Sequence, residues 1–129
     1  MVGRNAQLAI AALVELAKSE RRLSATEIAE GTALTQPSVA KVLSTLRQGD
    51  FIVSVPGPGG GFTLSRPAQN INVLDICIFF DLQTAIPDDC AITCDCSDDA
   101  PCKVCGALKN VDDLRESTLR HLTIQTLAA

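Results

Sequence analysis

Five of the six cysteines lie between residues 90 and 105, and four of them follow the regular pattern Cys90-x5-Cys96-x5-Cys102-x2-Cys105. A cysteine thiolate is a soft anionic ligand, and four thiolates complete the coordination of a tetrahedral zinc ion or of the irons of a small cluster. Only the last pair has the two-residue gap typical of zinc sites, whereas the two five-residue gaps favour a larger bound group. The spacing therefore predicts an iron–sulfur cluster held by these four residues. Zinc binding and metal-free thiol–disulfide switching are the alternatives.

The two remaining cysteines have different surroundings in the sequence. Cys94 lies between two predicted ligands, so it can replace one of them or form a disulfide with Cys96. Cys77 occupies the apolar face of a predicted helix, where cysteine usually acts as a small buried hydrophobic residue. We therefore treat Cys94 as an alternate ligand or redox thiol and Cys77 as part of the core.

The residues before the cysteines predict a helix-turn-helix followed by a β-hairpin. Ser24 and Glu27 have the spacing of a capping box, and Pro37 falls in the first turn of the next helix, where its missing N–H costs nothing. A glycine-rich turn over 57–61 separates two short apolar runs. Helices are predicted over 5–18, 24–29 and 35–48, and strands over 51–55 and 62–64. This order is that of a winged helix-turn-helix, with Leu8, Leu13, Leu16, Val39, Val42, Leu43 and Leu46 as core residues.

The rest of the chain predicts two more helices joined by a long connection. A helix over 72–81, capped by Asn72 or Asn70, buries an apolar face formed by Ile76, Cys77, Phe79 and Phe80. Helical periodicity returns over 103–121, with an apolar stripe at Leu108, Val111, Leu114, Leu119 and Leu122. A protomer of this size cannot cover both this stripe and the first helix, so we expect a homodimer formed through the last helix.

The predicted fold is thus mainly α with a small β-hairpin wing (α+β). A winged helix-turn-helix DNA-binding domain over 1–67 precedes a region over 68–129 that holds the cysteine loop and the dimerisation helix. A recognition helix presents its N-terminal residues to base edges in the major groove, where Gln36 can pair with adenine and Lys41 can reach guanine or a phosphate. Gln36 can equally be a plain helix-start residue. The predicted contacts to a double-stranded DNA operator are Thr35, Gln36, Ser38, Lys41, Gly57, Gly59, Gly60 and Arg66.

Charge and composition exclude other classes of protein. Residues 1–66 carry seven Lys and Arg against five Asp and Glu, whereas residues 67–129 carry four against ten, in agreement with the net charge of −4. An acidic chain does not coat nucleic acid nonspecifically, but its basic half can bind on one face. A signal peptide around Leu8–Val14 is disfavoured because Glu15 and Lys18 interrupt the apolar run. No apolar run is long enough to span a membrane, so we expect a cytoplasmic protein.

Catalysis has no support in the sequence. The chain holds a single histidine, His121, near the end of the last predicted helix, and no nucleophile–base set or phosphate-binding motif. We therefore expect no enzymatic activity and no small-molecule substrate. An electron carrier or cluster-delivery protein built on the same scaffold is a third, minor alternative.

Two segments resemble a known family. The runs over 57–62 and 64–67 resemble the wing of the iron–sulfur and nitric-oxide-responsive repressors typified by IscR and NsrR, and the run over 71–76 resembles the helix that follows it. Cys90, Cys96 and Cys102 match the family's cluster spacing. The resemblance implies a homodimeric winged-helix transcription regulator whose 2Fe–2S or 4Fe–4S cluster changes its affinity for DNA.

The sequence departs from that family's pattern at several positions. IscR-like members supply a histidine three residues after the last cysteine, where this chain has Cys105, and others use a residue of the first helix, where this chain offers Asn5 and Gln7. Cys105 is therefore our expected fourth ligand. Pro56 replaces an arginine common at the start of the wing, and Ala40 stands where the recognition helix often carries a charge. The family's operator sequence therefore cannot be transferred to this chain.

Overall fold

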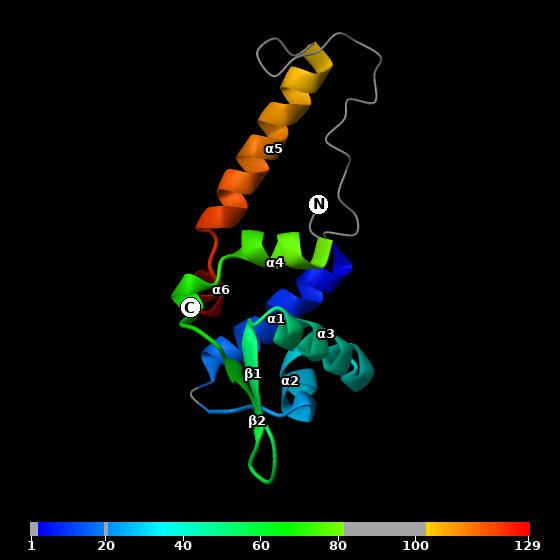
Figure 1. The fold of residues 1–129 in the computed structure, drawn as a ribbon, viewed down its shortest axis with the longest axis vertical. Coiled ribbons are helices and arrows are strands. Elements are labelled where there is room, and N and C mark those ends of the chain that lie inside the picture. The colour runs from blue at the N-terminus through cyan, green and yellow to red at the C-terminus, as the bar shows by residue number, and fades with distance from the viewer. Residues whose placement is uncertain (1–2, 20, 82–102) are drawn as a thin grey trace.

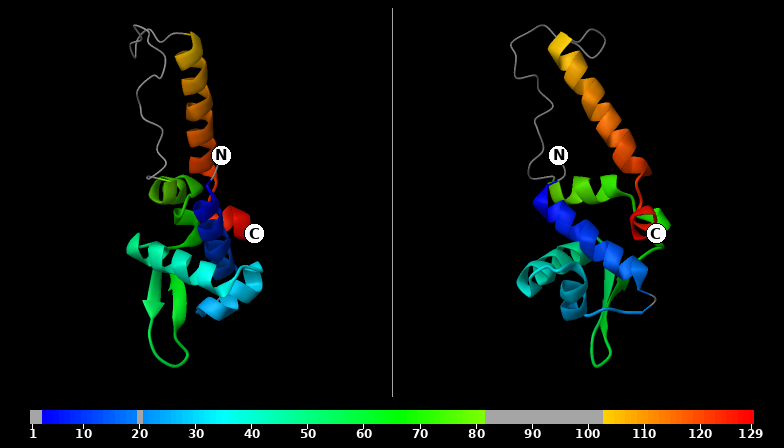
Figure 2. Two further views of the ribbon diagram at one scale, coloured as in Figure 1. Left: turned by 90° about the vertical axis from the view of Figure 1, so that its right-hand side faces the viewer. Right: turned by 180° about the vertical axis from the view of Figure 1, so that it is seen from behind.

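The computed structural model describes residues 3–19, 21–81 and 103–129, except for the side chains of residues 81, 103–105, 108 and 109. A two-stranded antiparallel sheet is accompanied by helices (Figure 1). The wing hairpin and α5 extend from opposite ends of the body that the other helices form, as the views of Figure 2 also show. The elements in chain order are α1 (Arg4–Lys18), α2 (Ala25–Thr32), α3 (Gln36–Gln48), β1 (Ile52–Val55), β2 (Gly61–Leu64), the 3₁₀ turn η1 (Ala68–Asn70), α4 (Val73–Asp81), α5 (Lys103–His121) and α6 (Ile124–Ala128).

The start of α2 is the predicted capping box. The Ser24 hydroxyl accepts a hydrogen bond from the Glu27 backbone N–H at 3.2 Å, and the Glu27 carboxylate accepts one from the Ser24 N–H at 3.3 Å. The helix continues to Thr32, three residues beyond the predicted end at Ala29, and ends at Ala33 with a φ of 58°. Gly31 lies inside this helix next to α1, where a Cβ would meet the Glu15 carboxylate at 2.5 Å.

The core lies between α1 and α3. α1 buries Ala6, Ala9, Ala12, Leu13 and Leu16, and its three buried alanines allow close approach of neighbouring helices. The predicted inner stripe of α3 is confirmed, since Val39, Val42, Leu43 and Leu46 are all buried. Leu8 is only partly buried, in contrast to its predicted core position. Burial of this apolar surface is the main source of stability in such a domain.

The wing is a short hairpin with a third strand segment at its edge. β1 and β2 pair in the register Ile52↔Leu64 to Val55↔Gly61. Leu23, in the connection from α1 to α2, forms a bridge with Phe62: the Phe62 N–H donates to the Leu23 carbonyl at 2.8 Å, and the Leu23 N–H donates to the Phe62 carbonyl at 3.2 Å. The winged helix-turn-helix order predicted from the sequence is confirmed, and the Leu23 bridge ties the wing to the helices.

The C-terminal residues return to the body. Asn72 caps α4, because its side-chain oxygen accepts the Asp75 N–H at 2.8 Å. Ile76 and Cys77 are buried as predicted, whereas Phe79 and Phe80 are only partly buried. After α5 the short helix α6, which the sequence did not predict, places Ile124 in the core with no exposed surface. The Ile124 N–H donates to the Ile71 carbonyl at 2.9 Å, so backbone pairing holds this segment beside η1.

Candidate functional site

The N-cap and first turn of α3 hold three of the predicted DNA contacts, Thr35, Gln36 and Ser38. Thr35 is at the N-cap position, but its hydroxyl donates to the Ser38 hydroxyl at 2.8 Å and does not cap the backbone. The Gln36 side-chain amide donates to the Thr26 hydroxyl of α2 at 2.9 Å, and both residues are exposed. To contact a base edge, the Gln36 amide would therefore have to break its hydrogen bond to Thr26. Thr26 was missed as part of this turn because only the tertiary fold brings it next to Gln36.

The exposed face of α3 carries only positive charge. Lys41 and Arg47 are exposed, and no acidic residue occurs between residues 36 and 48. Among the residues that the structure describes, neither cation takes part in an ion pair. Arg47 was not among the predicted contacts; it is six residues from Lys41 and so lies about 120° away around the helix, at the side of the buried stripe. An unpaired cationic helix face beside a wing suits contact with phosphates.

The tip of the wing exposes backbone in place of side chains. Gly57, Pro58, Gly59 and Gly60 form a turn in which the Gly60 N–H donates to the Gly57 carbonyl at 2.9 Å. Gly59 has a φ of 72°, which suits the third position of a type II turn after Pro58. A Cβ on Gly60 would collide with the Val55 carbonyl oxygen. The three glycines predicted to approach DNA thus lie together at the tip of the wing.

Arg66 lies at the base of the wing, apart from that tip. Its guanidinium carbon is 5.3 Å from the centre of the Phe51 ring, in a cation–π contact. Ser65 strengthens the same corner, since its hydroxyl donates to the Asp50 carbonyl at 2.5 Å. The predicted DNA contacts therefore form two groups, one at the start of α3 and one on the wing, with Arg66 near the end of α3.

An ion pair stabilises the connection between α1 and α2. The Arg21 guanidinium is 2.5 Å from the Glu27 carboxylate. The hydrogen bond from Arg21, followed by that from the Ser24 backbone, holds the pKa of Glu27 below its ordinary value of 4.5. Since Glu27 also closes the capping box, its charged form links this connection to the start of α2.

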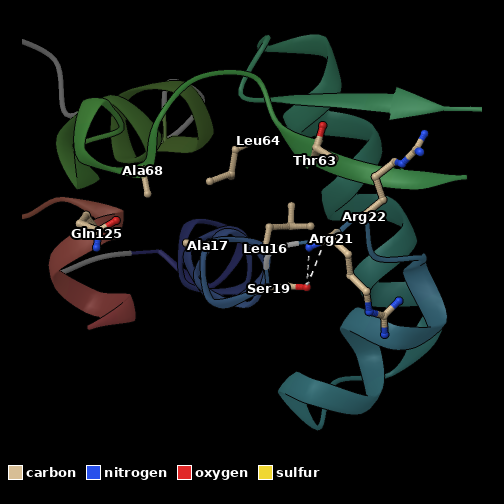
Figure 3. A pocket seen from close by; sticks show the side chains of 9 residues that line it. All are labelled: Leu16, Ala17, Ser19, Arg21, Arg22, Thr63, Leu64, Ala68 and Gln125. Carbon is tan, nitrogen blue, oxygen red and sulfur yellow. Dashed lines mark hydrogen bonds between the residues drawn. The ribbon is translucent and has the colours of Figure 1, made fainter.

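A hollow of about 560 Å³ lies between α1, β2, η1 and α6. Figure 3 shows that the guanidinium ends of Arg21 and Arg22 lie away from Leu16 and Ala17 on its floor. The side chains labelled there around the α6 end are Leu64, Ala68 and Gln125, which carry no charge. The charged residues of the lining are Arg21 and Arg22.

Four of the cysteines that carry the predicted sensor chemistry, Cys90, Cys94, Cys96 and Cys102, lie outside the described residues. Cys105 is the third residue of α5, with its backbone alone described. Cys77 is 3% exposed and packs with Ala6, Val73, Leu74 and Leu119, which confirms its place in the core. Within residues 3–19, 21–81 and 103–129, no three His, Cys, Asp or Glu side chains gather into a possible metal site.

Within the described residues, two large apolar side chains of α5 have little cover. Leu119, near the body, is 8% exposed, but Leu114 is 70% exposed and Val111 is 61% exposed. His121 is exposed, as predicted for the end of this helix. In the part of the chain that the structure describes, no helix combines the length and apolar character needed to cross a bilayer.

A helix-turn-helix with an unpaired cationic recognition helix and a glycine-tipped wing defines the class of winged-helix DNA-binding proteins. Residues 2–129 match the Rrf2 family, described as iron-dependent transcriptional regulators, and the chain belongs to this family. It is thus a DNA-binding transcription regulator, as the resemblance implied.

Curated relatives agree with this assignment. The HTH-type transcriptional regulator named BadM from Rhodopseudomonas palustris is 32% identical over 122 residues, which cover 90% of this chain and 73% of that protein. The HTH-type transcriptional regulator IscR of Cereibacter sphaeroides is 35% identical over 75 residues, or 57% of this chain and 48% of the relative. These relatives are regulators and not enzymes, which confirms the prediction that the chain is not an enzyme.

Solved structures share the fold. IscR of T. potens superposes with a TM-score of 0.77 at 24% identity, covering 98% of this chain and 85% of that one. CymR, the global cysteine regulator of B. subtilis, superposes with a TM-score of 0.82 at 22% identity, covering 99% and 95%. At these identities the likeness confirms the winged-helix architecture.

Proposed function

We propose that the chain regulates transcription through an iron–sulfur cluster held by Cys90, Cys96, Cys102 and Cys105. The position of these cysteines in the chain carries the proposal. They occupy the single connection that leaves α4 after Asp81 and enters the first turn of α5. α4 packs against α1, and α5 carries the uncovered apolar residues, so the connection joins the DNA-binding body to the proposed dimer helix.

The donor set suits such a group. Four thiolates are the usual ligands of 2Fe–2S and 4Fe–4S clusters, and the family's description as iron-dependent supports iron over zinc. When bound, the cluster supplies a centre whose charge and integrity depend on redox state, nitric oxide or iron–sulfur supply. Cys105 would be the fourth ligand in place of histidine, which lowers the expected reduction potential. Cys94 would be an alternate ligand or a redox thiol.

The DNA side of the proposal uses the two groups of contacts described above. Gln36 and Lys41 would reach base edges in the major groove, with Thr35 and Ser38 at the helix start. Gly57, Gly59 and Gly60 would bring the wing backbone to the adjacent groove, and Arg66 would contact a phosphate from the base of the wing. The exposed cationic face of α3 supports this orientation.

A second copy of the chain would cover α5. Val111 and Leu114 are the most exposed of the large apolar residues described, and both belong to α5. A symmetric helix pair would bury both stripes and place two recognition helices on one duplex. Coupling between cluster state and DNA affinity in such regulators is typically about 1–3 kcal/mol, or roughly 5–150-fold. We therefore propose that the chain forms a cytoplasmic homodimer that binds a double-stranded DNA operator.

The deciding experiment is anaerobic purification followed by a visible spectrum and by counts of iron and acid-labile sulfide per chain. A broad absorbance band at about 400 nm, with iron and acid-labile sulfide in equal amounts per chain, supports the cluster. DNA affinity is then measured before and after the cluster is removed. A colourless protein that stays colourless after reconstitution would exclude the cluster. Zinc in that sample would indicate a structural zinc site, and a response to reductant alone would indicate a thiol switch through Cys90, Cys94 or Cys96.

A further inference from the structure

The end of the recognition helix and the base of the wing form one joint, which comprises residues 49–51 and 65–66. The Phe51 N–H donates to the Leu46 carbonyl of α3 at 3.0 Å. The Ser65 N–H, just after β2, donates to the Phe51 carbonyl at 3.1 Å. Phe51 is thus bonded to α3 through its N–H and to the residue after β2 through its carbonyl. The direction in which the wing leaves α3 therefore depends on the position of Phe51.

Phe79 of α4 is packed into this joint. Its ring meets that of Phe51 edge to face, with centroids 5.6 Å apart and an angle of 66° between the planes. Phe80 meets Phe79 in the same manner at 5.5 Å. Arg66 covers Phe51 from another side. Phe51 is 4% exposed, so its position is determined largely by these neighbours.

Gly49 shows that the ring of Phe79 requires this space. A Cβ on Gly49 would lie 2.8 Å from the Phe79 ring, closer than real Cβ contacts come. The φ of Gly49 is −84°, a value that any residue adopts, so the backbone does not require glycine at this C-cap. The absence of a side chain at the end of α3 is therefore explained by the aromatic ring that α4 brings there.

We infer that Phe79 is a positioning residue for DNA binding, which sets the angle between the recognition helix and the wing from its place on α4. The inference rests on the proposed function in one respect, which is that a change in the proposed cluster displaces α4. The helix ends at Asp81, next to the connection that carries the cysteines. A displacement of α4 would therefore move the Phe79 ring and change the spacing of α3 and wing on the duplex.

The test compares Phe79→Ala with Leu74→Ala in the cluster-free full chain. Leu74 is a buried residue of the same helix, but it packs in the cluster of Ala6, Cys77 and Leu119, whereas Phe51 belongs to the other core cluster. The probe is the tightest duplex that the wild-type protein selects from a random-sequence library. We expect about tenfold weaker binding for Phe79→Ala, from the loss of an aromatic pair, and less than about twofold for Leu74→Ala. Hydroxyl-radical protection should be lost under the wing and kept under α3.

Gly49→Ala tests the same contact from the opposite side. Its Cβ would lie 2.8 Å from the Phe79 ring and 3.0 Å from the Phe51 ring, so it disturbs the contact between the two rings and should reproduce the lower affinity and the lost protection under the wing. Phe79→Leu, which keeps apolar volume without a ring, replaces Phe79→Ala if that variant does not fold. Wild-type affinity in Gly49→Ala and the Phe79 variant, or an equal loss in Leu74→Ala, would overturn the inference.

A second measurement separates this inference from the proposed function. The ratio of DNA affinities with and without cluster is measured for the wild type and for Phe79→Ala. A wild-type ratio of one would contradict the cluster proposal, while the cluster-free comparison above would still decide the role of Phe79. A wild-type ratio above one that falls toward one in Phe79→Ala supports Phe79 as the link. An unchanged ratio would exclude that link.

Discussion

α3 and α5 carry similar apolar patterns but differ in what covers them. In α3 the four stripe residues are at most 4% exposed, whereas on α5 Val111 and Leu114 are more than half exposed. Apolar periodicity indicates that a helix face needs a cover and does not tell where that cover comes from. α3 finds its cover within the protomer, beside α1 and α2. On α5 the described residues leave Val111 and Leu114 without such cover, as the proposed dimer requires.

The largest effect on DNA affinity is expected from the cysteine connection. Replacing Cys96 or Cys102 with Ala should abolish visible absorbance and change operator affinity by about 5–150-fold, because a missing thiolate opens the cluster to loss. Absorbance spectra and binding curves on anaerobic protein measure both. Cys77→Ala is the matched control, since Cys77 lies in the core, and it should retain the colour. Unchanged affinity in both ligand variants would remove the sensing role of this region.

The second prediction compares the loss of a leucine side chain from α3 with the same loss from α5. Leu43→Ala should lower the free energy of unfolding by about 2–5 kcal/mol, because Leu43 is 1% exposed and a cavity remains. Leu114→Ala should cost less than about 0.5 kcal/mol in dilute protein, where the residue faces solvent. Urea unfolding at low concentration measures both values. Similar losses in the two variants would show that α5 is covered within one protomer.

The same leucine tests the proposed dimer. Leu114→Glu should shift the chain to the monomer in sedimentation, because a charge in an apolar interface is costly unless it is paired. Its dilute-solution stability should stay close to that of the wild type. Asp113→Asn, a neighbouring substitution on α5, serves as the control and should leave the association state unchanged. A Leu114→Glu dimer as tight as the wild type would contradict assembly through this face.

A smaller effect is expected from arginines on the two helices. Arg47→Ala on α3 should lower DNA affinity similarly for all sequences and reduce the slope of log K against log salt by about 1, as expected for one phosphate contact. Arg115→Ala on α5, also exposed, should leave both quantities unchanged. Titrations at several salt concentrations measure the slopes. Equal slopes for the two variants would place the DNA away from α3.

The smallest effect concerns pH. The pKa of Glu27 is lowered in the folded state, so its contribution to stability is full above the ordinary value of 4.5 and is lost as the pH falls through the folded pKa. Glu27→Gln should remove this acid dependence while leaving a side chain able to cap Ser24. Thermal unfolding between neutral and strongly acidic pH measures the change. Glu30→Gln, an exposed neighbour, is the control; the same loss of acid dependence in that variant would contradict the assignment to Glu27.

The sequence by itself determined those features that depend on neighbours within one or two helical turns. The capping box of Ser24 and Glu27, the buried stripe of α3 and the Asn72 cap are local, so residue types at short spacing were enough to predict them. The resemblance in the wing and the cysteine spacing indicated the family. The ligand role of the cysteines stays a prediction.

Only the tertiary structure decided which distant side chains meet. The Gln36–Thr26 hydrogen bond, the Leu23–Phe62 bridge and the Phe79 ring against Gly49 join residues that no local period relates. The short helix α6 has too few residues to show a period, and backbone bonds to Ile71 and the burial of Ile124 hold it in place. Such contacts depend on the free energy of packing summed over the whole core, which a local pattern does not contain.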